Sequence, residues 1–226
     1  MTDLQTLLAP NLYPGRGVLC ARTRSGAIHG GYFLTGRSAA SKDRALRVDG
    51  EELVVGPVTP AEHDPLRHYA AAMSTAGWLV YGNGEQVAQV TRRLGEGVSA
   101  ADSLGGLEYE PDPPIRTSRI TALLQRDGHT AVLGAARPSS GSRRCANVMT
   151  LTVRDLEPGE AVLMTTYHSN GRTVLTAAPF EETTISAQDG AELLEEIWSS
   201  LSREFRIAAA VLDPEQGPAA ALLRSA

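Results

Sequence analysis

Short apolar segments recur along the chain, each bounded by glycine, proline or serine, and this pattern is typical of β-strands separated by turns. In the first half it predicts strands at residues 18–22, 27–35, 53–55 and 78–81. The first two are joined by a turn at Ser25-Gly26, so we expect them to form a hairpin.

Helical signals lie between these strand groups. Asp64-Pro65 has the form of a helix N-cap followed by proline at the first helical position, and it predicts a helix that continues through Tyr69 to Met73. A second helix is predicted at residues 85–94 and a short third one near residues 100–104.

The second half repeats this organisation. Strands are predicted at residues 118–125, 130–135, 146–153, 161–167 and 207–212. The helical period predicts one amphipathic helix from its apolar positions, which are Ala191, Leu194, Ile197, Trp198 and Leu201. Strands in hairpin-like succession, with helices between strand groups, indicate an α+β fold. We expect a single domain at residues 13–226, preceded by an N-terminal extension at residues 1–12.

Composition limits the class of protein. The chain has 226 residues, of which 42% are hydrophobic and 21% charged, enough for a buried core. The formal net charge of −5 argues against a general nucleic-acid-binding protein. No segment has the apolar length of a membrane span, and residues 1–5 have no basic region followed by an apolar run, so we expect no signal peptide. We therefore expect a cytoplasmic protein that binds neither nucleic acid nor a membrane.

Cysteine and histidine usage gives no sign of a metal centre. The five histidines lack the spacing of metal ligands, so we expect no metal and no cofactor. Cys20 and Cys145 are expected to be free thiols in a reducing compartment. Cys20 could also be a nucleophile, but it lies in an apolar strand with no adjacent base, which favours a buried structural thiol.

Charge is distributed unevenly along the chain. Residues 1–50 carry seven Lys or Arg against three Asp or Glu, and residues 116–150 carry six against one. Residues 51–115 and 151–226 each have a local net charge of −7. We hypothesise that the two basic segments gather their cations around one small anion.

Two candidate clusters lie in the first basic segment. Gly15-Arg16 stands at the head of a strand, and Thr35-Gly36-Arg37-Ser38 is followed by Lys42 and Arg44. A loop of this composition offers backbone N–H groups, hydroxyls and guanidinium groups to a phosphate. The alternative for this loop is an ordinary solvated turn.

Two further clusters follow. Tyr69 precedes Gly82-Asn83-Gly84-Glu85, where a strand enters a helix and backbone can approach an anion closely. The segment Glu108-Tyr109-Glu110-Pro111-Asp112 can hold a carboxylate in place, with Arg116 and Arg119 close behind. The alternatives are a core tyrosine and an acidic loop that faces solvent.

Together these segments resemble the archaeal-type inosine monophosphate (IMP) cyclohydrolases and their bacterial relatives. They occur in the family's order over residues 13–120, and they are Tyr13-Pro14-Gly15-Arg16-Gly17, Tyr32-Phe33-Leu34-Thr35-Gly36-Arg37-Ser38 with Ser41 and Arg44, Asp64-Pro65 with Tyr69, Gly82-Asn83-Gly84, Tyr109-Glu110-Pro111-Asp112 and Thr117-Ser118-Arg119-Ile120.

The resemblance implies a four-layer αββα sandwich like that of N-terminal-nucleophile hydrolases. It also implies a hydrolase acting on a cyclic amidine C–N bond in purine biosynthesis. In that reaction the carboxamide nitrogen of formyl-aminoimidazole carboxamide ribonucleotide attacks the formyl carbon, and water is lost to give IMP; the reverse step is hydrolysis. The implied partner is a small-molecule purine nucleotide, and a homo-oligomer is left open.

The resemblance places the family's catalytic residues on Arg44, Tyr69 and Glu110. In this interpretation the arginine stabilises negative charge on the carboxamide oxygen, the carboxylate takes a proton and the phenol donates one to the departing hydroxyl. Contacts with phosphate, ribose or base are expected from Arg16, Arg37, Ser38, Asn83 and Arg119.

This chain departs from the family pattern at several positions. Ile115 and Ser118 stand where Asn and Pro are common, and Glu85-Gln86 replaces a Ser-His pair of some members. A cyclohydrolase for a modified purine-like nucleotide and a non-catalytic nucleotide-binding protein therefore stay as alternatives. An amidohydrolase with Thr2 as its nucleophile is disfavoured, because such a residue must begin a strand inside the site.

Overall fold

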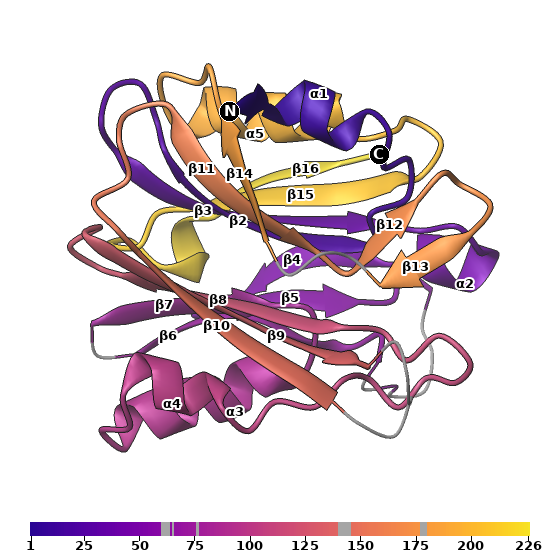
Figure 1. Cartoon of the computed structure of the whole chain (residues 1–226), viewed down its shortest axis with the longest axis horizontal. Coiled ribbons are helices and arrows are strands. Elements are labelled where there is room, and N and C mark those ends of the chain that lie inside the picture. Colours follow the sequence, from indigo (N-terminus) through magenta and orange to yellow (C-terminus); the bar gives the residue numbers. More distant parts are fainter. Residues whose placement is uncertain (60–63, 65, 76, 140–145, 177–179) are drawn as a thin grey trace.

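Two seven-stranded β-sheets stacked face to face form the body of the protein (Figure 1). The computed structural model describes residues 1–59, 64, 66–75, 77–139, 146–176 and 180–226. The first sheet has the strand order β1-β14-β11-β2-β3-β15-β16. Its strands are β1 (Thr2–Asp3), β14 (Glu181–Thr184), β11 (Glu160–Thr165), β2 (Arg16–Arg22), β3 (Ile28–Thr35), β15 (Arg206–Leu212) and β16 (Leu222–Ser225).

The second sheet is antiparallel throughout and has the order β10-β9-β8-β7-β6-β5-β4. Its strands are β10 (Ala146–Arg154), β9 (Thr130–Pro138), β8 (Arg119–Gln125), β7 (Trp78–Gly82), β6 (Tyr69–Thr75), β5 (Glu52–Gly56) and β4 (Ala45–Asp49). A separate two-stranded sheet pairs β12 (Tyr167–Ser169) with β13 (Val174–Thr176).

Helices lie on the outer faces of the two sheets. Helices α1 (Leu4–Leu8) and α5 (Gly190–Ser200) lie on the first sheet, and α3 (Gln86–Gly95) and α4 (Ala100–Leu104) on the second (Figure 1). The short α2 (Ala39–Lys42) and the 3₁₀ helix η1 (Pro218–Ala220) lie outside these pairs.

The main hydrophobic core fills the space between the sheets. Large apolar side chains of both sheets meet there, among them Leu34, Leu53, Leu79 and Ile120, and each is at most 1% exposed. Two smaller clusters bury the outer faces beneath α5 and beneath α3 with α4. One continuous core between the sheets makes this a single domain.

The expected four-layer αββα sandwich is wrong. Of the described residues, 43% are in strands and only 18% in helices, and they form three sheets with five short α-helices. A seven-stranded sheet is about 29 Å wide at a strand spacing of about 4.8 Å, whereas two helices cover about 20 Å. Because α1 and α4 have only five residues each, the helices cover the sheets in part and form no complete outer layers.

The helix expected to begin at Asp64-Pro65 and to include Tyr69 is also wrong. Tyr69 begins β6, which pairs with β5 and β7 on its two sides. Pro65 itself lies outside the described residues. The apolar residues of this segment are buried by sheet pairing, which overrides the local capping signal.

The predictions for the strands at residues 118–125, 130–135 and 207–212 and for the helix at residues 85–94 are confirmed, with small shifts at their ends. Residues 1–12 contain β1 and α1, and Leu4 and Leu8 of α1 are buried against the first sheet. The boundary between an extension and a domain at residue 12 stays a prediction. Among the described residues, no helix has the length and apolar character needed to span a membrane.

Candidate active site

Glu110 lies in the loop between α4 and β8, and internal hydrogen bonds fix the shape of this loop. The Glu110 N–H donates to the carbonyl oxygen of Thr117 at 2.8 Å. The carboxylate of Asp112 accepts from the Thr117 N–H at 2.7 Å and from its hydroxyl at 2.6 Å. The acidic segment is therefore a closed loop whose two ends are joined, and Glu110 is only 4% exposed.

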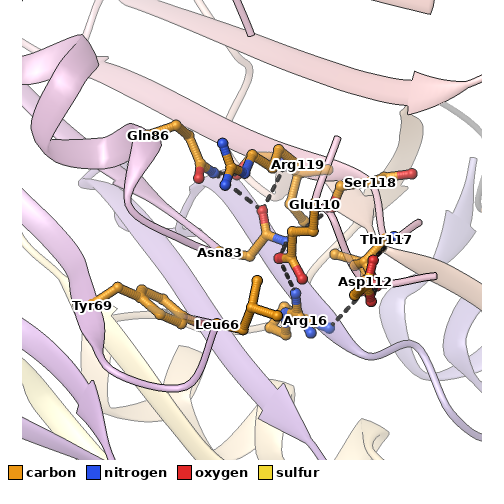
Figure 2. Close-up of polar contacts among 12 residues, drawn as sticks. Arg16, Leu66, Tyr69, Asn83, Gln86, Glu110, Asp112, Thr117, Ser118 and Arg119 are labelled. Atoms are coloured by element: carbon orange, nitrogen blue, oxygen red, sulfur yellow. Dashed lines mark hydrogen bonds and ion pairs between the residues drawn. The ribbon is translucent and has the colours of Figure 1, made fainter. Parts of the chain in front are cut away.

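The Glu110 carboxylate has two buried partners. It forms an ion pair with the guanidinium of Arg16 at the start of β2, and Oε1 also accepts from Nδ2 of Asn83 at 3.1 Å (Figure 2). Burial raises the pKa of Glu110 above its usual value, and the positive charge of Arg16 opposes this shift. A carboxylate with a raised pKa can exchange a proton nearer to neutral pH.

Asn83 holds the carboxylate in place from the turn between β7 and α3. Its Nδ2 also donates to the carbonyl oxygen of Ser118 at 2.9 Å, and its Oδ1 accepts from the Ile120 N–H at 2.6 Å. Gln86 donates to the same Oδ1 at 3.3 Å. Asn83 is fully buried, so its amide serves to fix the position of Glu110 relative to β8.

Gly82 permits this arrangement. A Cβ atom at position 82 would lie 2.5 Å from the carbonyl oxygen of Ile120, too close for any side chain. The glycine therefore allows β7 to end against β8, which brings Asn83 within reach of both Ser118 and Glu110.

Two tyrosines form a hydrogen-bonded pair beside this cluster. The hydroxyl groups of Tyr32 on β3 and Tyr69 at the start of β6 are 2.9 Å apart, and both side chains are buried. Burial raises the pKa of Tyr32 well above its usual value, so Tyr32 stays protonated at neutral pH.

Arg16 connects the carboxylate with the tyrosines. Its buried guanidinium interacts electrostatically with Glu110, Tyr69, Tyr167 and Tyr32. Its Nε is buried and has no hydrogen-bond partner within the described part of the chain. Residues from three strands and one loop thus converge on one arginine.

Tyr167 was not identified from the sequence. Its hydroxyl contacts the hydroxyl of Thr117 in the Glu110 loop, and its ring stacks on Tyr13 with centroids 5.7 Å apart. The Asn11 side chain donates to the carbonyl oxygen of Tyr167 at 2.9 Å. The only sequence signal was a strand prediction that covered residue 167, which gave no reason to place it near residue 117.

Arg44 is buried next to this cluster and is held by backbone. Its Nε donates to the carbonyl oxygen of Ser41 at 2.9 Å, and its Nη2 donates to that of Thr35 at 3.1 Å. It also interacts electrostatically with Tyr32. The structure therefore places all three residues expected to be catalytic in buried positions: Arg44, Tyr69 and Glu110.

Of the residues expected to bind substrate, some contact Glu110 and others do not. Arg16 and Asn83 contact Glu110 directly, as described above. Arg119 forms an ion pair with Glu85 at 3.0 Å. Exposed Arg37 lies 5.5 Å from the centre of the Tyr13 ring and donates to the carbonyl oxygen of Arg172.

Ser38 has a structural partner. It is the N-cap of α2, where its hydroxyl accepts from the Ser41 N–H at 3.1 Å. The structure thus brings Arg16 and Asn83 to the carboxylate and gives Arg37, Ser38 and Arg119 other contacts.

Cys20 shows no features of a nucleophile. It is buried in β2 at 1% exposure, and burial raises the pKa of its thiol to about 12. Cys145 lies outside the described residues. Within the described part of the chain, no three His, Cys, Asp or Glu side chains are grouped as ligands for a metal ion.

The protein is thus a two-sheet sandwich in which a carboxylate, two arginines and two tyrosines form one buried cluster. The family model described as IMP cyclohydrolase-like protein matches residues 13–217 of the chain. The protein therefore belongs to the IMP cyclohydrolase-like family, which confirms the resemblance and extends it well beyond residue 120. This membership supports a cyclohydrolase-type function. A search of curated proteins gave no match.

Proposed function

We propose that the protein is an IMP cyclohydrolase, which closes the ring of formyl-aminoimidazole carboxamide ribonucleotide to give IMP and water and also catalyses the reverse hydrolysis. The observation that carries the proposal is the buried Glu110 carboxylate, held by Arg16 and Asn83 beside a tyrosine pair. Family membership supports the class of reaction. The family match does not identify the substrate, so formyl-aminoimidazole carboxamide ribonucleotide is part of what we propose.

The chemistry needs one base and one acid. The carboxamide nitrogen forms a bond to the formyl carbon and loses one proton, while the formyl oxygen becomes a hydroxyl. That hydroxyl then leaves as water, together with the proton of the former formamide nitrogen. Both steps move protons and change no oxidation state, so the groups that act must exchange protons at neutral pH.

Glu110 is assigned as the group that takes the proton from the attacking nitrogen. Its raised pKa makes it a stronger base than an exposed glutamate, and two fixed partners hold it in one position. Tyr69 is assigned as the donor to the departing hydroxyl, because Tyr32 is hydrogen-bonded to it and can replace the proton it gives.

Arg44 is assigned to the carboxamide oxygen, where a guanidinium stabilises developing negative charge. Its contacts with Thr35 and Ser41 use Nη2 and Nε and orient the group without neutralising it. Arg16 is assigned a double role: it holds Glu110 and adds positive charge for the nucleotide. Arg37, Ser38, Asn83 and Arg119 remain our candidates for phosphate, ribose or base contacts.

An ultraviolet assay of the purified protein with formyl-aminoimidazole carboxamide ribonucleotide tests the proposal. We expect IMP to form at a rate proportional to enzyme concentration. A protein that binds the nucleotide but forms no IMP at any concentration would favour the non-catalytic binding protein. Turnover of only a modified purine-like nucleotide would instead favour the secondary-pathway enzyme.

A further inference from the structure

The edge strands of the two sheets differ in length. Three of the four edges are short: β1 has two residues, β16 four and β4 five. The fourth, β10, has nine residues that pair with β9 without a register shift. Short or charged edge strands are how proteins prevent sheets from pairing with one another, whereas β10 is long and has a single charged residue, Arg154, at its end.

The composition of β10 favours pairing. Residues 147–153 read Asn-Val-Met-Thr-Leu-Thr-Val and carry no charge, proline or glycine. Val148 is 40% exposed. Within the described part of the chain, no strand pairs with the outer edge of β10.

The register identifies which backbone groups point outward. The Asp155 N–H donates to the carbonyl oxygen of His129, so this pair is a hydrogen-bonded one, just beyond the last ladder pair of Arg154 with Thr130. Hydrogen-bonded and non-hydrogen-bonded pairs alternate in an antiparallel ladder. The N–H and C=O groups that face away from β9 therefore belong to Ala146, Val148, Thr150, Thr152 and Arg154.

This set of five residues is symmetric about Thr150. In an antiparallel pair centred on Thr150, Val148 of one copy lies opposite Thr152 of the other, and Ala146 lies opposite Arg154. Every residue whose N–H and C=O groups face away from β9 then lies opposite another such residue, so the backbone donors and acceptors of the two edges can pair. We propose that two copies of the chain associate through β10 edges in this register and form one continuous fourteen-stranded sheet.

The side chains of β10 that face the core also favour pairing with a second copy of the chain. Met149, Leu151 and Val153 pack against the core between the sheets but are only partly buried. Leu151 and Val153 also line a cavity of about 470 Å³ between β10 and β11. In the proposed register, Met149 of one copy lies opposite Leu151 of the other, so each edge would receive an apolar side chain beside this cavity.

Charge in the flanking sequence favours the antiparallel direction. Arg143 and Arg144, which lie outside the described residues, precede the strand in the sequence, and Asp155 and Glu157 follow it. An isologous pair places the beginning of one strand beside the end of the other, where Arg154, Asp155 and Glu157 together have a net charge of −1, so the two flanking segments carry opposite net charges.

Charge substitutions at positions 148 and 152 test the register. Sedimentation of the full chain at micromolar concentrations should give a species of twice its mass of 24.0 kDa. Val148→Asp combined with Thr152→Asp places like charges opposite each other, and the mass should halve. Val148→Asp combined with Thr152→Lys changes the same positions but places opposite charges together, so it should remain a dimer.

Thermal unfolding and circular dichroism establish that both variants fold. A monomeric unsubstituted chain would overturn the proposal. So would a dimer that neither pair of substitutions weakens.

A disulfide provides an independent measure of position. In a Cys145→Ser background, Thr150→Cys should crosslink on mild oxidation, because the two Thr150 Cα atoms would lie about 5.5 Å apart, within disulfide range. Val148→Cys in the same background should not crosslink, since the two copies of Val148 would lie about 14 Å apart along the strands. Crosslinking of Val148→Cys but not of Thr150→Cys would show that the register is wrong.

Discussion

Two loops of this protein were expected to contribute to its site, and they differ in how they are held. The Glu110 loop, residues 110–117, is closed by hydrogen bonds between its ends, and its carboxylate is buried. The Arg37 loop, residues 36–44, is exposed from Arg37 to Ala40, and its serines bond to each other. The comparison therefore separates a carboxylate that its surroundings hold in one position from an arginine, Arg37, that solvent can reach.

Glu110→Gln should have the largest effect of the substitutions that test this comparison. The amide keeps the shape of the side chain but cannot accept the proton, so ring closure should slow by about 10²–10⁴-fold. The assay with formyl-aminoimidazole carboxamide ribonucleotide measures it. Glu108→Gln, on an exposed residue of the same segment, is the control and should retain full activity. Equal rates in both variants would contradict the assignment of Glu110.

Arg16→Met should strongly destabilise the protein. It removes the partner of a buried carboxylate, and such a loss costs about 3–5 kcal/mol of the free energy of unfolding. Urea titration measures it. The double variant Arg16→Met with Glu110→Gln should recover part of the loss, because no buried charge is left unpaired. A double variant less stable than Arg16→Met would argue against an ion pair.

Asp112→Asn should loosen the Glu110 loop without removing the reacting group. The carboxylate accepts two hydrogen bonds from Thr117, and weakening them should cost about 1–3 kcal/mol. We expect a lower kcat with little change in KM, since the carboxylate is less well positioned. A change confined to KM would instead place Asp112 in nucleotide binding.

The raised pKa of Glu110 predicts how stability depends on pH. The folded state binds the proton more tightly than the unfolded state, in which the pKa is near 4.5, so this contribution to stability is lost as pH rises through the raised pKa. Urea unfolding of the unsubstituted protein above pH 4.5 should show this loss, whereas Glu110→Gln should lack it. Identical pH profiles would show that burial does not shift this group.

Arg37→Ala should have the smallest effect on stability. The side chain is exposed, so the free energy of unfolding should change by less than about 0.5 kcal/mol. If Arg37 contacts the phosphate, KM should rise while kcat stays the same. The exposed Arg203→Ala, on a segment outside both loops, serves as the control. An unchanged KM would remove Arg37 from the binding site.

Much of the architecture could be predicted from local patterns, and the two failures have different causes. Strands such as β8, β9 and β15 have strong apolar segments and clear turns. At Tyr69 the capping signal of Asp64-Pro65 indicated a helix, but pairing with β5 and β7 made the segment a strand. The four-layer sandwich was implied by the family resemblance and not by a local pattern, and it was wrong because the described helices are few and short and do not cover both sheets.

The candidate site could also be predicted only in part. Turn residues and charge marked the segments that contain Arg16, Asn83 and Glu110, and the family resemblance selected these residues within them. The contacts of Tyr167 with Thr117 and of Tyr32 with Tyr69 join segments that are 50 and 37 residues apart, so no local signal could pair them. Contacts between side chains that are brought together only by the tertiary structure could therefore not be predicted from local sequence patterns.

Asn11 has a consequence for any shortened form of the protein. Its side chain donates to the carbonyl oxygen of Tyr167 and accepts from the Ser169 N–H, both at 2.9 Å. The family match begins two residues later, at residue 13. A chain trimmed to the matched segment would therefore keep every residue assigned to the reaction. It would lose the two hydrogen bonds by which Asn11 holds β12, the strand that carries Tyr167 and its contact with the Glu110 loop.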